Sequence, residues 1–182
     1  MNQALIFIIA TVTLAGISRA SLLAPRSHGF ARFFAWEAIL GLVVLNAPAW
    51  FRDPFAPRQL VSWVFLAVSI ALVVPGVHLL RSAGRPGPGR ADATLLGIEK
   101  TSRLVTHGIY GYIRHPLYAS LLFLAWGAFL KQLSWLSLLL ACSASLFLFI
   151  TARRDELECI QYFGPDYQTY MERTKRFVPF VF

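Results

Sequence analysis

The residues best suited to chemistry lie in one short polar stretch, Gly108–Tyr118 (GIYGYIRHPLY), at the start of a long apolar run. Pro116 is well placed in the first turn of a helix, where its missing N–H leaves no hydrogen bond unmade. The free N–H groups of that turn, together with Arg114, could bind an anionic group. His115 and Tyr118, three residues apart, would share a helical face. The stretch is therefore a candidate binding or reaction site.

A structural alternative exists for this stretch. Arg114 could extend its side chain to a membrane surface, and Tyr118 could anchor a helix end in the interface. That alternative accounts less well for His115 and Pro116. Ionisable residues at membrane depth or at its edge usually line a cavity or a reaction site.

A second polar cluster, Arg153-Arg154-Asp155-Glu156, follows the last long apolar run. On its own, this cluster is explained by arginines that anchor a helix at the membrane surface and by solvated acids. Glu37 and His78 are single polar residues within apolar runs. We expect these two to form hydrogen bonds between helices.

Composition indicates an integral membrane protein. Of the 182 residues, 57% are hydrophobic and 14% are charged, whereas a soluble domain carries about a quarter charged residues. The net charge of +8 does not indicate a nucleic-acid partner, because the basic residues fall between apolar runs. The two cysteines, Cys142 and Cys159, provide neither a disulfide framework nor metal-ligand spacing, so no metal is expected.

The chain is predicted to form one all-α domain, 1–182, a membrane helical bundle of about five transmembrane helices with a cytoplasmic helical tail. A spanning helix needs about 20 apolar residues, and the fourth run has only 14. The fourth and fifth runs are expected to form a hairpin that enters only part of the bilayer or thins it locally. The expected transmembrane runs are 4–24, 33–51, 60–80, 117–130 and 133–150. A cytoplasmic connector at 81–116 joins the third run to the hairpin at 117–150. The tail, 151–182, is expected to contain helices at 155–163 and 166–175.

The distribution of basic residues predicts the orientation. With this arrangement, Arg52, Arg58 and Lys131 lie on one side, and the other 14 of the 17 Lys and Arg residues lie on the opposite side. Because basic residues gather in cytoplasmic loops, the N-terminus is expected outside and the C-terminus in the cytoplasm. Both polar clusters would then face the cytoplasm.

Two segments stand out together, Leu104–Tyr110 (LVTHGIY) and Tyr112–Tyr118 (YIRHPLY). They resemble the signature of the isoprenylcysteine carboxyl methyltransferase family, which related phospholipid methyltransferases share. The tail is also similar to the family pattern, which has an acidic pair, Phe-Gly, Tyr-x-x-Tyr and a final Arg and Pro. In this sequence these positions are Asp155-Glu156, Phe163-Gly164, Tyr167, Tyr170, Arg173 and Pro179.

The resemblance implies a small membrane enzyme whose cofactor, S-adenosylmethionine, lies between the Arg-His-Pro stretch and the tail. It implies that Arg114 lies at the reacting end of the site. The sequence departs from the family pattern at Asp155, where Glu is usual, and at Thr151, where many members have an arginine; Arg153 and Arg154 are the nearest substitutes. The residues implied to contact or adjoin the cofactor are His115, Tyr118, Glu156, Tyr110, Leu104, Val105 and Gly108.

Methyl transfer from an activated sulfonium needs positioning and desolvation more than acid–base chemistry. A carboxylate acceptor needs only a cation, for which Arg114, Arg153 and Arg154 are candidates. An amine acceptor needs a base, for which Glu156 and His115 are candidates. The leading hypothesis is carboxyl O-methylation of an isoprenylcysteine-like substrate. Phospholipid amine N-methylation, a sterol-reductase-like NADPH enzyme and a non-enzymatic membrane scaffold are the alternatives.

The expected partners are membrane lipids and a lipophilic or lipidated substrate that enters laterally between helices, while the cofactor enters from the cytoplasm. The sequence leaves the oligomeric state open.

Overall fold

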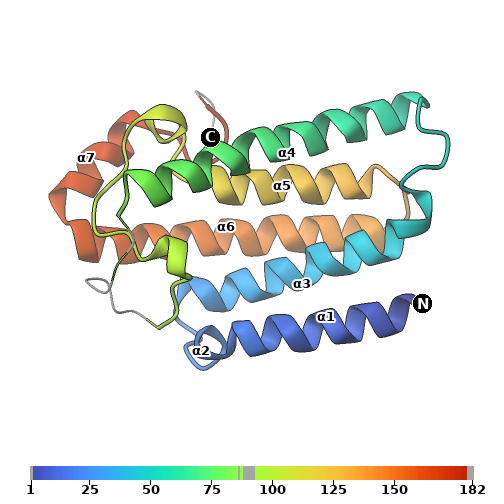
Figure 1. Ribbon diagram of the computed structural model, residues 1–182, viewed down its shortest axis with the longest axis horizontal. Coiled ribbons are helices and arrows are strands. Elements are labelled where there is room, and N and C mark those ends of the chain that lie inside the picture. The colour runs from blue at the N-terminus through green and yellow to red at the C-terminus, as the bar shows by residue number, and fades with distance from the viewer. Residues whose placement is uncertain (1, 86, 88–92, 180–182) are drawn as a thin grey trace.

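The computed structural model describes residues 2–85, 87 and 93–179, and this part of the chain is helical, as predicted (Figure 1). An isolated β-bridge pairs Ile113 with Lys175. The α-helices are α1 (Gln3–Ile17), α2 (Arg19–Leu22), α3 (His28–Asn46), α4 (Pro57–Ser82), α5 (Pro116–Phe129), α6 (Trp135–Phe163) and α7 (Pro165–Arg173), and the 3-10 helices are η1 (Ala47–Ala49), η2 (Gly97–Glu99) and η3 (Gly108–Gly111).

The five apolar helices expected from the sequence are α1, α3, α4, α5 and α6. In the described part, three segments are long and apolar enough to cross a membrane, namely α3 with η1, α4 and α6, whereas α1 and α5 are apolar but shorter. The 14 residues of α5 extend about 21 Å, less than the roughly 30 Å hydrocarbon core of a bilayer. A membrane helical bundle is therefore consistent with the structure, and α5 is the shortest of its five apolar helices.

Helix α6 is longer than expected, because the tail helix predicted at 155–163 is its continuation. Its 29 residues extend about 44 Å, so one end projects beyond the hydrocarbon core. No Gly or Pro interrupts the run before Gly164-Pro165. Gly164 has a φ of +61°, a conformation that glycine adopts without strain, and it ends the helix.

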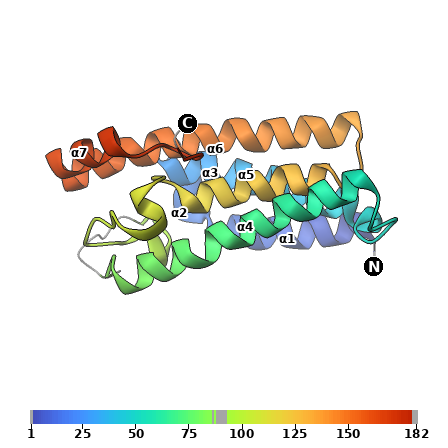
Figure 2. The ribbon, with the colours of Figure 1, turned by 90° about the horizontal axis from the view of Figure 1, so that it is seen from above.

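The helices pack in three layers (Figure 2). Helix α6 lies on one side, α3 and α5 lie in the middle, and α1 and α4 lie on the other side; α6 contacts α3 and α5, while α1 contacts α3 and α4 contacts α5. The core is rich in small side chains, which let helices approach closely in a membrane. The fully buried alanines in it are Ala35, Ala119, Ala125, Ala128, Ala141, Ala144 and Ala152.

Side chains from neighbouring helices satisfy the carbonyl groups at the end of α5. Ser62 Oγ donates to Gly127 O (2.7 Å), and Asn46 Nδ2 donates to Ala128 O (2.8 Å). Arg58 donates to the carbonyls of the turn that follows. A helix end buried in an apolar environment needs such partners. This capping explains how so short a helix can end inside the bundle.

Lys131, in the turn after α5, is completely buried. Its Nζ donates to Gln59 Oε1 (3.0 Å) and lies 3.2 Å from the centroid of the Trp63 ring. Elsewhere, Thr11 Oγ1 donates to Glu37 Oε2 (2.8 Å) and so ties α1 to α3, the kind of interhelical contact expected for Glu37.

The two polar clusters lie at the same end of the bundle. The connector between α4 and α5, the start of α5, the end of α6 and α7 gather at the end opposite the N-terminus (Figure 1). The positions of these elements bring segments that are about 40 residues apart in sequence into contact. Which face of a membrane this end occupies stays a prediction.

Candidate functional site

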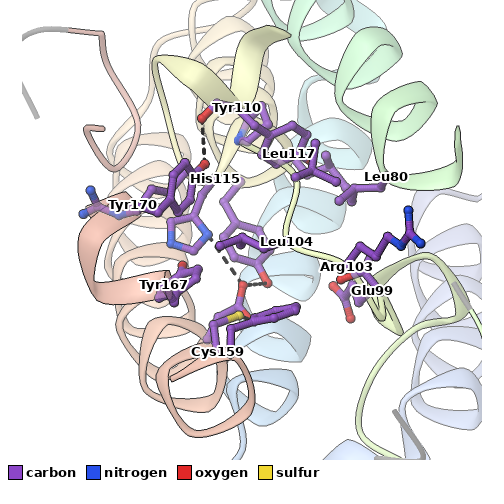
Figure 3. Close-up of a pocket in the computed structure, with 17 residues that line it drawn as sticks. Leu80, Glu99, Arg103, Leu104, Tyr110, His115, Leu117, Cys159, Tyr167 and Tyr170 are labelled. Carbon is purple, nitrogen blue, oxygen red and sulfur yellow. Dashed lines mark hydrogen bonds and ion pairs between the residues drawn. The ribbon is translucent and has the colours of Figure 1, made fainter. Parts of the chain in front are cut away.

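A cavity of about 660 Å³, counting the space open at its mouth, lies at this end of the bundle (Figure 3). The connector, the first turn of α5, the end of α6 and α7 all contribute walls. The lining residues are Leu80, Glu99, Thr101, Arg103, Leu104, Val105, Tyr110, Arg114, His115, Pro116, Leu117, Tyr118, Asp155, Cys159, Phe163, Tyr167 and Tyr170.

One wall is built by the first turn of α5 against α6. Pro116 begins α5, as predicted, and His115, which is 5% exposed, is the N-cap residue but makes no capping hydrogen bond through its side chain. The His115 ring stacks on Tyr118, with centroids 5.2 Å apart. Tyr118 donates its hydroxyl to Asp155 Oδ2 (3.2 Å), which lies 3.5 Å from His115 Nδ1. This wall therefore combines an imidazole, a phenol and a carboxylate.

Tyrosines form a second wall. Tyr170 donates its hydroxyl to Tyr110 O (2.7 Å), and Tyr110 donates to Gly76 O (3.3 Å). Burial raises the pKa of Tyr110, Tyr167 and Tyr170 well above the usual value. These phenols are therefore neutral at physiological pH and act as aromatic surfaces and hydrogen-bond donors.

Arg114 and Glu156 hold the C-terminal tail in place. Both Nε and Nη2 of Arg114 lie 3.0 Å from Glu156 Oε1, and Nη1 donates to the carbonyls of Met171 and Thr174. Arg176 binds the same carboxylate through Nε (3.1 Å) and Nη2 (2.7 Å). Glu156 is 4% exposed and does not line the cavity. This buried trio joins the start of α5 to the end of α6 and to the segment after α7.

Backbone hydrogen bonds reinforce that junction. Arg114 N donates to Lys175 O (2.8 Å), and Lys175 N donates to Tyr112 O (3.0 Å), which forms the isolated bridge. As a result, α7 stays against the cavity with Tyr167 and Tyr170 facing it (Figure 3).

The other residues expected at the site are placed as follows. Leu104, Val105 and Tyr110 line the cavity, but Gly108 does not. Gly108 has a φ of +61°, and a Cβ there would lie 2.7 Å from Leu79, so only glycine fits the turn comfortably. Arg153 and Arg154 do not line the cavity either: Arg153 is exposed, and Arg154 donates to the carbonyls of Pro25 and Ser27.

Sequence reasoning assigned no role to several residues that the fold brings to the cavity. Asp155, Tyr167 and Tyr170 were part of the tail pattern, and that pattern was the available signal. Glu99 and Arg103 precede Leu104 in the connector but carried no signal of their own. Phe163 was also part of the tail pattern, and Pro116 was part of the Arg-His-Pro stretch. The further lining residues without an assigned role are Leu80, Thr101, Leu117 and Cys159.

Glu99 belongs to a buried ion cluster beside the cavity. Arg32 donates to its carboxylate, and His28 Nε2 lies 3.6 Å from it. Burial alone would raise the pKa of Glu99, but the hydrogen bond from His28 and the charge of Arg32 hold it at about 2. The negative charge of Glu99 is therefore balanced within the protein.

The same cluster brings possible metal ligands together. One ligand atom from each of His28, Asp155 and Glu158 lies within 4.8 Å of the other two. His28 Nδ1 is hydrogen-bonded to Glu158 Oε2 at 2.6 Å, and Arg32 Nη1 lies 3.2 Å from His28 Nε2. These contacts account for the grouping as an ion cluster.

The sequence profile of the phospholipid methyltransferase family matches residues 61–165, from α4 to the beginning of α7. Two rice proteins (Oryza sativa subsp. indica and japonica), each named a probable protein-S-isoprenylcysteine O-methyltransferase, are 28% identical over 123 residues, which cover 65% of this chain and 63% of theirs. Methanethiol S-methyltransferase 1 of Bradyrhizobium diazoefficiens is 29% identical over 86 residues, 47% of this chain and 30% of that protein. The chain thus spans less than two thirds of these relatives. No solved structure matches it.

Proposed function

The chain belongs to the phospholipid methyltransferase family, and on that premise we propose that it transfers a methyl group from S-adenosylmethionine to a lipophilic acceptor. The observation that carries the proposal is the shared cavity: the Arg-His-Pro stretch and the tail, which are far apart in sequence, form walls of the same cavity. The family match favours methyl transfer over the NADPH-dependent and non-enzymatic alternatives.

The residues of the cavity fit this cofactor. His115 Nε2 is buried and forms no hydrogen bond with any described residue, although it lies 3.4 Å from Glu156 Oε1. The rings of Tyr167 and Tyr170 offer aromatic faces, which attract cations such as a sulfonium. When bound, S-adenosylmethionine supplies an already activated methyl group. His115, Tyr118 and Asp155 would hold the polar part of the molecule, and the tyrosines would shield the reacting centre from water.

The acceptor would use the apolar side of the same cavity. Leu80 lies on α4, Leu117 on α5 and Leu104 in the connector between them, and all three line the cavity (Figure 3). A hydrocarbon chain that enters between these helices would place its head group at the polar wall. Catalysis would then depend on alignment of the two reactants rather than on a strong acid or base.

The rice relatives support an isoprenylcysteine-like carboxylate as the first candidate acceptor. One observation supports an amine head group as the second. Arg114, the expected partner of a carboxylate, is already bound to Glu156 and to two carbonyls. Asp155, by contrast, lines the cavity and could accept the proton that an amine must lose.

Calorimetry tests cofactor binding, and methyl transfer from labelled S-adenosylmethionine to prenylcysteine analogues and to amine-headed lipids tests the acceptor. His115→Ala should weaken cofactor binding, while His78→Ala, which removes an exposed imidazole from α4, should not. A folded wild-type protein that binds no S-adenosylmethionine would refute the proposal.

Likewise, we propose that the cavity opens to the cytoplasm, in line with the excess of basic residues at that end.

A further inference from the structure

Arg103 is a cation in the cavity wall that binds no partner group among the described residues. It lies in the connector, beside Glu99 and Leu104, and it lines the cavity. Its side chain is exposed, and no other described residue forms a hydrogen bond or an ion pair with its guanidinium. Figure 3 shows it at the connector side of the cavity, away from Cys159 on α6.

The other arginines near the cavity are already engaged. Arg114 and Arg176 bind Glu156, Arg32 binds Glu99, and Arg154 donates to backbone carbonyls. Glu99 is the acid nearest to Arg103 in sequence, but its charge is balanced by Arg32. Arg103 therefore leaves a positive charge at the rim that no described acid neutralises, and such a charge attracts an anionic group.

We propose that Arg103 binds a carboxylate of the ligand in this cavity, through charge-assisted hydrogen bonds of the kind that guanidinium groups form with carboxylates. The inference rests on the proposed methyl transfer, which brings two candidate carboxylates into the cavity. One is the amino-acid end of S-adenosylmethionine, and the other is a carboxylate acceptor. If the acceptor supplies the carboxylate, Arg103 takes the role that the sequence gave to Arg114.

The first arm of the test measures binding of S-adenosylhomocysteine, which keeps the amino-acid carboxylate, and of 5′-methylthioadenosine, which lacks it. Arg103→Gln should weaken the first roughly three- to tenfold, because the pair is charged but exposed, and should leave the second unchanged. Arg103→Lys should keep most of the affinity. Arg81→Gln, at an exposed position on α4 outside the cavity, is the matched control.

The second arm measures KM for a prenylcysteine carboxylate and for an amine-headed lipid. If the acceptor is the source of the carboxylate, Arg103→Gln should leave S-adenosylhomocysteine affinity unchanged and raise KM roughly three- to tenfold for the carboxylate alone. An effect in neither arm overturns the inference. A wild-type protein that binds neither nucleoside would instead refute the proposed function, so the two failures are distinguishable.

Discussion

Replacing Glu156 with glutamine should release the C-terminal tail rather than remove a catalytic group. The side chain of Glu156 is 6% exposed, and it binds Arg114, 8% exposed, and Arg176, 19% exposed. Breaking a buried ion pair from one side costs about 3–5 kcal/mol, because the remaining charge stays buried. Arg176 is close enough to solvent to turn outward, so we expect a loss at the low end, about 3 kcal/mol.

For a chain of this size, that loss corresponds to a melting temperature lower by roughly 6–12 °C. Thermal unfolding in detergent measures it, and limited trypsin digestion should show faster cleavage after Arg173, the last residue of α7, and after Lys175 in the segment that follows. Glu172→Gln, an exposed acid on α7, is the control and should change neither. Unchanged melting and cleavage together with lost cofactor binding would contradict this interpretation and would assign Glu156 to direct ligand contact.

Three other perturbations test the rest of the structure. The folded protein lowers the pKa of Glu99 to about 2, so the ionised carboxylate stabilises the fold above the unfolded-state pKa near 4.3, and this stabilisation is lost as pH falls toward 2. Near neutrality, wild type should be about 3 kcal/mol more stable than Glu99→Gln, and thermal melts at decreasing pH should show this difference closing between about pH 4.3 and about pH 2. Lys131→Met should cost about 2 kcal/mol in thermal unfolding, because it removes the contact with Trp63 and leaves Gln59 Oε1 unpaired; no loss would mean that burying the charge already offset these contacts. Gln132 is exposed next to the buried Lys131, so a cysteine at position 132 can be labelled with an impermeant maleimide. We expect Gln132→Cys to react from the side of the membrane opposite to a cysteine placed in α7. Labelling of both cysteines from the same side would show that the α5–α6 hairpin does not cross the bilayer.

Local sequence signals determined the helices and the end of the bundle at which the polar residues gather. Hydrophobic runs have the length and spacing of membrane helices, and Pro116 and Gly164 act on the backbone of their own turns. The distribution of basic residues predicted that both polar clusters share one end, as the fold has it. The signature segments also led to the family, which the profile match supports. These inferences depend only on residues that are neighbours in sequence.

The tertiary structure decided what each polar side chain binds. Successive residues on a helix point about 100° apart, so Asp155 faces the cavity while Glu156, its neighbour, faces the tail. Arg114 lines the cavity, but its guanidinium binds Glu156 and backbone carbonyls of the tail. Arg103 had no distinguishing signal, yet it supplies a cation that no described residue neutralises. A sequence gives the identity and local direction of a charged group, but its partner is set by distant segments whose approach depends on the packing of the whole bundle.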